Sequence, residues 1–189
     1  MDGLEGRTYV VTGAASGIGR GTAARLMAAG SNVALLDRDT ERVAAAAREL
    51  AGPGESLALG CDVTDLAAVD AAVDATVERF GAVHGAVTSA GIFHPADMVD
   101  LDAVDLDVFD EVLAVNLRGT VHLLKAVLPR LGPGGAVVTI ASTAGLRGHG
   151  FGPGYTASKG AVVALTRLVA VQYGPRGIRA NCVCPGATA

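Results

Sequence analysis

Short apolar runs rich in β-branched residues alternate along the chain with longer Ala-rich stretches whose apolar residues recur at helical spacing. The short runs are continuously apolar, which is typical of parallel strands covered by helices on both faces. The strands predicted in this way are Thr8–Thr12, Asn32–Leu36, Ser56–Gly60, Gly85–Thr88, Ala136–Ala141 and Ile178–Val183. The predicted helices are Ile18–Ala29, Glu41–Ala51, Leu66–Phe80, Val108–Leu131 and Thr156–Tyr173. The alternation predicts an α/β fold with a doubly wound parallel sheet.

Polar residues at the predicted helix starts support these boundaries. Thr40 is expected to cap the second helix, and Asp65 or Thr64 the third, because a side-chain oxygen can accept a hydrogen bond from a free helix N–H. The chain shows no internal repeat and no linker, so residues 1–189 are expected to belong to one domain.

Composition narrows the class of protein. Half of the 189 residues are hydrophobic, aromatic residues make up 4% and Trp is absent, so the core must be built from Ala, Val, Leu and Ile. So much apolar sequence excludes disorder. The formal net charge of −4 argues against a general nucleic-acid binder.

The sequence carries no obvious membrane or secretion signal. No apolar run approaches the about 20 residues that a membrane helix needs, and the acidic start lacks the layout of a signal peptide. The three cysteines are an odd number, and Cys182 and Cys184 are expected on one face of a strand but too far apart to bridge. These features favour a reduced, cytoplasmic compartment and no membrane partner.

A glycine-rich segment follows the first predicted strand and opens directly into a helix. It reads Thr12-Gly13-Ala14-Ala15-Ser16-Gly17-Ile18-Gly19, with the spacing Gly-x-x-x-Gly-x-Gly in place of the commoner Gly-x-Gly-x-x-Gly. Glycines let the backbone turn sharply and approach a pyrophosphate, which then lies at the positive N-terminus of the helix. A tight strand-to-helix turn without a ligand is the alternative. The place of the segment in the chain favours a dinucleotide site with contacts from Gly13, Ser16, Gly17, Ile18 and Gly19.

Asp37 follows the second predicted strand, 18 residues after Gly19. A carboxylate at this place accepts hydrogen bonds from the adenosine ribose hydroxyls and repels a 2′-phosphate, which favours NAD over NADP. Arg38 is the counter-argument, since a guanidinium there could hold a phosphate. A solvated strand end is the alternative for both residues.

Two further segments are expected at the same edge of the sheet. Asp62 could accept from the adenine amino group and Val63 could line its ring, or Asp62 could simply begin a turn. Thr88-Ser89-Ala90-Gly91 ends the fourth strand where the strand order should reverse, which is where cofactors lie in such sheets. Ser89, Ala90 and Gly91 are therefore candidate cofactor contacts.

Tyr155 and Lys159 lie four positions apart in a predicted helix and share a face. Of the 15 Lys and Arg residues only Lys125 and Lys159 are lysines, which indicates a place where arginine would not serve. A free phenol, with a pKa of about 10, is a poor base at neutral pH, and a neighbouring ammonium favours the phenolate. Tyr155 could then take a proton from an alcohol as hydride leaves for NAD, or return it in the reverse direction. A surface Tyr packed over a Lys stem is the alternative.

Five motifs together make the chain resemble the short-chain dehydrogenases/reductases (SDR family). They are the glycine-rich turn, Asp37, Asn116 in Val115-Asn116-Leu117, Ser142 thirteen residues before Tyr155, and Tyr155-x-x-x-Lys159, in the family's order and spacing. The later Pro185-Gly186 matches as well. The resemblance covers the whole chain and implies a Rossmann-type NAD(P)-binding domain with further cofactor contacts at Pro185 and Gly186.

The resemblance also implies roles for the polar residues. Ser142 would hydrogen-bond the substrate oxygen and stabilise developing charge. Lys159 would bind the nicotinamide ribose and tune Tyr155, and Asn116 would hold a water that connects Lys159 to a proton relay. Read alone, Ser142 is a strand-end turn former and Asn116 a hydrogen-bonded helix kink.

Two departures from the family pattern are visible. Thr88-Ser89 stands where the family often has Asn-Asn, which removes a side chain that braces the cofactor loop. Members of the family continue after Pro185-Gly186 with a substrate lid, a further helix and a seventh strand. We therefore expect these 189 residues to be a C-terminally incomplete version of the domain, without the lid and the last strand.

Acidic residues gather between Arg79 and Arg118, where the chain has no Lys or Arg. They are Asp97, Asp100, Asp102, Asp105, Asp107, Asp110 and Glu111. Because the Gly position and the closing Glu of a calcium loop are absent, a solvated loop that leads to a helix N-terminus is expected. The histidines His84, His94, His122 and His149 lack metal-ligand spacing, so no metal site is predicted. His94 and His149, with Phe93 and Phe151, are candidates for substrate specificity.

The helices that carry Asn116 and Tyr155 are apolar around more of their circumference than one packing face requires. The residues concerned are Leu113, Leu117, Val121, Leu124, Val163, Leu165, Leu168 and Val171. In the family these helices form a homodimer face, usually within a tetramer. A homodimer or homotetramer is therefore expected.

These observations together predict an oxidoreductase that transfers a hydride between NAD and a secondary alcohol or ketone. The alternative is a non-catalytic dinucleotide sensor or scaffold of the same fold, which would not need to keep Asn116, Ser142, Tyr155 and Lys159. A methyltransferase with a similar glycine turn would not explain Tyr155-x-x-x-Lys159. The sequence leaves the identity of the substrate open.

Overall fold

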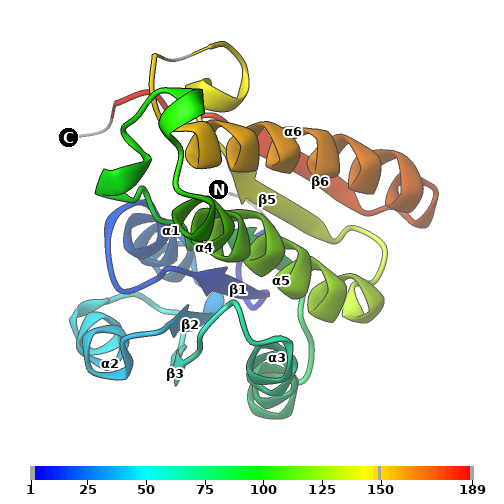
Figure 1. Ribbon diagram of the computed structural model, residues 1–189. Helices are drawn as coiled ribbons and strands as arrows, with labels where there is room; N and C mark the ends of the chain where they lie inside the picture. The colour runs from blue at the N-terminus through cyan, green and yellow to red at the C-terminus, as the bar shows by residue number, and fades with distance from the viewer. Residues whose placement is uncertain (1–2, 149, 188–189) are drawn as a thin grey trace.

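The computed structural model describes residues 3–148 and 150–187. In this part of the chain a six-stranded parallel sheet has the order β3-β2-β1-β4-β5-β6 and is flanked by helices (Figure 1). The strands are β1 (Thr8–Thr12), β2 (Asn32–Asp37), β3 (Ser56–Gly60), β4 (Gly85–Thr88), β5 (Ala136–Ile140) and β6 (Arg179–Val183). The α-helices are α1 (Gly17–Ala28), α2 (Thr40–Glu49), α3 (Leu66–Phe80), α4 (Leu106–Leu113), α5 (Gly119–Val127) and α6 (Pro153–Tyr173). The predicted doubly wound parallel sheet is confirmed.

Several short helical turns lie between these strands and helices. They are η1 (Pro95–Asp97), η2 (Leu101–Ala103), η3 (Ala114–Arg118), η4 (Leu128–Arg130), η5 (Thr143–Gly145) and η6 (Gly174–Arg176). His149 lies outside the described residues, so its predicted role in specificity stays a prediction.

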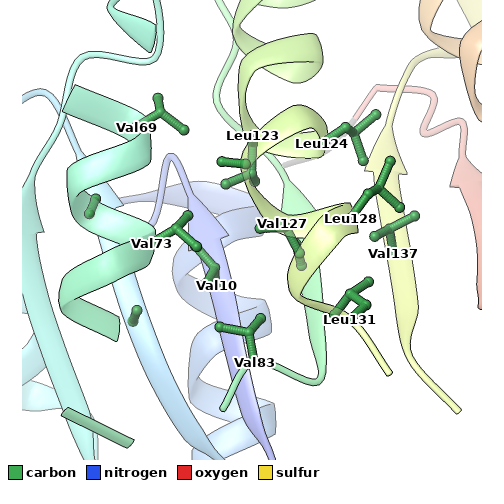
Figure 2. Packing of buried hydrophobic residues seen from close by; sticks show 14 of the residues in the cluster. Val10, Val69, Val73, Val83, Leu123, Leu124, Val127, Leu128, Leu131 and Val137 are labelled. Carbon is green, nitrogen blue, oxygen red and sulfur yellow. The ribbon is translucent and has the colours of Figure 1, made fainter. Parts of the chain in front are cut away.

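Neighbouring residues of each central strand face opposite sides of the sheet, as the continuous apolar runs predict. Val10 of β1 packs in one core cluster, where Val69 and Val73 of α3 lie opposite Leu123 of α5 (Figure 2). The next residue, Val11, packs in a second cluster on the other face with residues of α1 and α2. Helices therefore cover both faces of the sheet.

The strand order reverses between β1 and β4, which pair in parallel from Tyr9↔Gly85 to Thr12↔Thr88. Both strands consequently end at the same edge of the sheet, side by side. The segments that follow β1 and β4 are the glycine-rich turn and Ser89–Gly91, so the topology brings these two predicted cofactor segments together.

The predicted helix Val108–Leu131 is not uniform. It begins earlier, as α4, and passes through the wider π turn η3 before continuing as α5 and η4. At Gly119 the helix approaches the turn between β3 and α3 so closely that a Cβ there would lie 2.6 Å from Val63 Cγ2. The prediction of one regular helix is therefore wrong at Asn116, where buried polar contacts compete with the regular pattern.

The residues that cap α2 and α3 test two of the predicted helix starts. Asp65 caps α3 as predicted, accepting from the N–H groups of Ala67 and Ala68. Helix α2, however, is capped by Asp39, which accepts from Arg42 N, while Thr40 is already the first helical residue. The expectation for Thr40 is therefore wrong by one position.

The helical stretch Leu106–Arg130 is long and apolar enough, by length and composition only, to cross a membrane. Half of the most apolar 18-residue segment within this stretch is buried inside the protein, which is consistent with a helix that packs on the core. The sequence expectation that nothing approaches such a span was too strict, because it counted uninterrupted apolar residues only.

Strand β6 is the outer strand next to β5, and its residues alternate between exposed and partly buried. No seventh strand occurs in residues 3–148 and 150–187. The C-terminal incompleteness of the domain stays a prediction.

Candidate active site

A cavity of about 950 Å³ at the carboxyl ends of the strands brings most of the predicted site residues together. Those that line it are Gly13, Ser16, Gly17, Ile18, Asp37, Arg38, Asp62, Val63, Ser89, Ala90, Gly91, Ser142, Tyr155, Lys159, Pro185 and Gly186. Gly19 and Asn116 are not part of the lining. The sequence interpretation missed several lining residues, which are Arg42, Cys61, Thr64, Ile92, Glu111, Ala114, Val115, Arg118, Ile140 and Ala141.

The glycines after β1 are required by contacts between backbones. Gly13 has a φ of +65°, and a Cβ there would lie 2.8 Å from Ala90 N. A Cβ at Gly19 would lie 2.2 Å from the Gly13 carbonyl oxygen. Ser16 precedes α1 without a side-chain cap, so the first N–H groups of this helix have no side-chain partner. Donors at a positive helix end beside a close-packed glycine turn fit a phosphate-bearing dinucleotide.

The loop after β4 is braced from β1. Thr12 Oγ1 accepts hydrogen bonds from Ser89 N and Ala90 N, each at 3.2 Å. The buried Thr12 hydroxyl therefore braces this loop, although the Asn-Asn pair that often stands there in the family is absent. Sequence reasoning missed Thr12 because its only local signal is a hydroxyl at the end of a buried strand.

Asp37 and Asp62 both hold backbone turns at the rim of the cavity. Asp37 Oδ2 accepts from Ala15 N at 3.1 Å, which ties the end of β2 to the glycine-rich turn. Asp62 accepts from the N–H and the hydroxyl of Thr64, both at 2.8 Å, and these bonds lower the pKa of Asp62. Asp62 therefore begins a turn, which was one of the two roles expected for it. The other role, a contact with adenine, stays a prediction.

Lys159 lies inside the protein, one helical turn after Tyr155. Its side chain is 5% exposed, Nζ donates to the Ile140 carbonyl at 2.9 Å, and Nζ lies 5.7 Å from the centroid of the Tyr155 ring. Burial lowers the pKa of Lys159 from 10.5 to about 8, opposed by the nearby Cys182 and Cys184. A surface tyrosine over a lysine stem is excluded by this burial.

Asn116 is fully buried in the π turn and joins three parts of the site. Its Oδ1 accepts from Ile92 N at 2.7 Å, and its Nδ2 donates to Ile92 O at 2.9 Å and to Ser158 Oγ at 3.1 Å. A Cβ at Gly91 would come within 3.1 Å of Asn116 Oδ1, which explains the glycine there. Asn116 is thus hydrogen-bonded at an irregular turn, and its part in a water relay stays a prediction.

Ser142 caps the short turn η5 with a hydroxyl that accepts from Ala144 N at 3.1 Å. Because the hydroxyl accepts in this bond, its own hydrogen is left to donate to an oxygen in the cavity. Burial and the neighbouring Cys182 raise the pKa of the Cys184 thiol, and the backbone of Ser142 acts in the opposite direction. The sulfur atoms of Cys182 and Cys184 are 3.8 Å apart, and both thiols are free, in agreement with the expectation that they do not bridge.

The acidic stretch does two different things. Asp105 accepts from Asp107 N at the start of α4, as predicted for acids at a helix N-terminus. Asp97, however, is fully buried and accepts from Gly154 N and Tyr155 N of α6. The expectation of a solvated residue is wrong for Asp97, because it pairs with amides that are distant in sequence and leave no local signal.

Aromatic rings and histidines around the site have structural partners. The Phe93 ring lies edge-on to Tyr155 at 5.2 Å between centroids, and Phe151 lies 6.2 Å from Phe93. His94 Nδ1 accepts from Ala96 N in η1. In the described part of the chain no three His, Cys, Asp or Glu side chains are grouped to hold a metal ion.

Comparison with known proteins shows the family to which the chain belongs. The sequence model of the short chain dehydrogenase family matches residues 7–189. The chain belongs to the short-chain dehydrogenase family. Its relatives are named as dehydrogenases and reductases, which supports oxidoreduction between alcohols and ketones in general.

Two curated relatives of this short-chain dehydrogenase are similar over nearly all of its length. The 2-(R)-hydroxypropyl-CoM dehydrogenase of Xanthobacter autotrophicus is 43% identical over 184 residues, which cover 95% of this chain and 74% of the relative. The levodione reductase of Leifsonia aquatica is 42% identical over 186 residues, covering 96% of this chain and 69% of the relative.

Solved structures show the same fold. The crystal structure of levodione reductase superimposes with a TM-score of 0.90 at 40% identity, covering 97% of this chain and 72% of the other. A 3-ketoacyl-(acyl-carrier-protein) reductase from Brucella melitensis, complexed with NADH, gives a TM-score of 0.90 at 32% identity. It covers 97% of this chain and 77% of the other. The Rossmann-type fold of this short-chain dehydrogenase is confirmed.

The buried Lys159 of this short-chain dehydrogenase should make stability depend on pH in a defined direction. Its folded-state pKa of about 8 lies below the unfolded value of 10.5, so the unfolded chain binds more protons between these values and stability rises with pH there. Between about pH 7 and pH 9.5 we expect the wild type to gain about 2 kcal/mol relative to Lys159→Met. Urea unfolding of both proteins at both pH values measures this difference. Parallel pH curves would show that Lys159 titrates normally.

Proposed function

We propose that the chain is an NAD-dependent oxidoreductase that interconverts a secondary alcohol and a ketone, with Tyr155 as general acid and base. The observation that carries this proposal is the arrangement of Tyr155, the buried Lys159 and Ser142 along one cavity with the glycine-rich turn. A proton donor, a cation beside it, an oxygen-binding hydroxyl and a phosphate-binding turn are the parts that such a reaction needs.

The chain's own residues divide into those that hold the cofactor and those that act on the substrate. Gly13, Ser16, Gly17 and Ile18 would hold the pyrophosphate, and Asp37 the adenosine ribose. Val63, with Ser89, Ala90 and Gly91, would line the rest of the cofactor. Bound NAD supplies the site that accepts or returns a hydride.

Tyr155 would take the proton of the substrate hydroxyl in oxidation and return it in reduction. Ser142 would donate its free hydrogen to the same substrate oxygen, which stabilises the charge that develops there. The Lys159 ammonium beside the Tyr155 ring favours the phenolate, and its burial strengthens this effect because screening by water is weak. Asn116 would keep the loop after β4 and α6 at a constant separation through Ile92 and Ser158.

The polar groups around Tyr155 favour an enzyme over a non-catalytic sensor or scaffold of the same fold. The Tyr155 phenol beside the Lys159 ammonium, and the Ser142 hydroxyl on the same cavity, are groups for proton transfer, which a protein that only binds a dinucleotide does not need. The relatives are named for activities on different substrates, including hydroxypropyl-CoM and levodione, so a small alcohol or ketone is the class proposed here.

The charges at the adenosine end favour NAD over NADP. Asp37 ends β2 and is held in place by Ala15 N and Asp39 N, so its negative charge stays at the rim of the cavity. Arg38 and Arg42 line the same cavity and are the groups that could oppose this preference. The NADH complex of the Brucella melitensis relative adds support from a solved structure.

We also propose a homo-oligomer, a dimer or tetramer, in a reduced cytoplasmic compartment. Of the apolar residues predicted to face a partner, Leu124 and Val163 are buried within the chain itself, whereas Val121, Leu168 and Val171 are exposed. The three exposed residues lie on α5 and α6, which cover the same side of the sheet (Figure 1). Three free thiols fit a reducing environment.

Removal of the phenol hydroxyl tests the proposed chemistry. We expect Tyr155→Phe to lower kcat by at least about a hundredfold, because proton transfer by a positioned group contributes about that much. NADH formation with a panel of isopropanol, cyclohexanol and threitol measures the rate. Tyr173→Phe, at the far end of α6, is the matched control and should keep its activity. Full activity in Tyr155→Phe would overturn the role of the phenol, and no turnover of any alcohol or ketone would favour the sensor.

Cofactor preference tests Asp37. The wild type should bind NAD at least about tenfold more tightly than NADP, a difference of about 1.4 kcal/mol. Asp37→Asn keeps the shape of the side chain and removes its charge, so the difference should become smaller. Calorimetric titration of both proteins with both cofactors measures the four dissociation constants. Tighter binding of NADP by the wild type contradicts the proposal.

Light scattering at micromolar concentration tests the oligomer. The wild type should have at least twice the mass of one chain, and Leu168→Asp should dissociate it because the side chain would place a charge in an apolar contact. Leu101→Asp is the control, since Leu101 is also an exposed leucine but belongs to η2 and not to α5 or α6. A stable monomer of the wild type would count against the proposal.

A further inference from the structure

The loop after β4 supplies the N-terminal cap of the helix that carries Tyr155. Helix α6 begins without a cap of its own, since its N-cap Gly152 has a φ of +78° and no side chain, and Pro153 has no N–H. Asp97 of η1 takes this place. Its Oδ1 accepts from Gly154 N at 2.9 Å, and its Oδ2 accepts from Tyr155 N at 2.8 Å. A carboxylate distant in sequence therefore satisfies the first free donors of α6.

These two bonds satisfy the buried carboxylate of Asp97. The side chain is fully buried, and no ion pair in residues 3–148 and 150–187 includes it. The two amides and the positive end of the α6 dipole are what compensate for its lost hydration. A buried carboxylate without such partners would be strongly unfavourable, so the start of α6 and η1 must stay together.

The space around the carboxylate leaves little freedom. A Cβ at Gly154 would lie 3.2 Å from Asp97 Oδ1 and 3.3 Å from the Cα of Phe109 in α4. A Cβ at Gly152 would lie 3.6 Å from Asp97 Oδ2. The start of α6 is therefore packed closely against both η1 and α4.

The same loop also holds the ring of Tyr155. Phe93, four residues before Asp97, lies edge-on to the Tyr155 ring at an interplanar angle of 87°. Tyr155 is thus held at its backbone by Asp97 and at its ring by Phe93. One turn later, Lys159 is fixed to the Ile140 carbonyl at the end of β5.

We propose that Asp97 is a positioning residue for the Tyr155 phenol. It holds the first turn of α6, and with it Tyr155, at the cavity that Ser142 also lines, and it takes no part in binding the cofactor, because it does not line the cavity itself. This inference rests on the proposed function, in which Tyr155 exchanges the substrate proton. A displacement of about 1 Å in a catalytic group can cost about a hundredfold in rate, so a support of this kind matters for turnover.

Amide hydrogen exchange tests the cap without any need for turnover. In the wild type we expect the Gly154 and Tyr155 amides to exchange as slowly as amides in the interior of α6, although first-turn amides usually exchange fast. In Asp97→Asn both should exchange at least about tenfold faster, because an amide side chain cannot accept from two N–H groups in this way. Fast exchange of both amides in the wild type overturns the proposal, even where Asp97→Asn does not fold.

Kinetics separate positioning from general destabilisation. Asp97→Asn should lower kcat for the best alcohol of the panel by at least about tenfold, with the dissociation constant of NADH changed by less than about twofold. Asp65→Asn is the control, because it removes the same charge from the N-terminus of another helix, α3, where Asp65 Oδ1 alone accepts from Ala67 N and Ala68 N. It should lower the melting temperature and keep kcat. An unchanged kcat in folded Asp97→Asn, or an equal loss in Asp65→Asn, overturns the proposal. If the wild type turns over no substrate, the proposed function fails, while the exchange data still decide whether Asp97 holds α6.

Discussion

The arrangement of the site depends on the hydrogen bonds of the buried Asn116 side chain. A fully buried amide must satisfy its donors and acceptor, and here the partners are the backbone of Ile92 and the hydroxyl of Ser158. These partners belong to the loop after β4 and to α6, so one side chain connects the cofactor edge of the sheet with the helix of Tyr155 and Lys159. The π turn in the helix of Asn116 and the glycine at position 91 accompany this contact.

The same region shows how polar groups are kept inside an otherwise apolar fold. Lys159 and Asp97 are buried charges, and each is held by backbone groups instead of by an opposite charge. Backbone partners are fixed by the sheet and the helices, so they hold a side chain in one place with little entropy cost at the moment of reaction. The apolar clusters on both faces of the sheet contribute the hydrophobic stabilisation that opposes the cost of burying such polar groups.

The regular elements were predictable because their signals are local. The limits of α3 agree with the prediction, and the predicted strands differ from the observed ones by at most one residue at an end. Patterns of apolar residues and capping side chains act over a few neighbouring positions, and the sequence contains them directly. The start of α6 at Pro153 was missed, because its cap comes from Asp97 and no neighbouring residue indicates it.

The sequence by itself determined the α/β class, the glycine-rich turn, the spacing of Ser142, Tyr155 and Lys159, and through them the family. Only the tertiary structure decided which polar residues support that set. Thr12 braces the loop after β4, Asp97 caps α6, and Asn116 connects the two segments. Each of these contacts joins residues far apart in the chain. Such contacts form only when strand order brings distant segments together, so no local pattern of residue types can predict them.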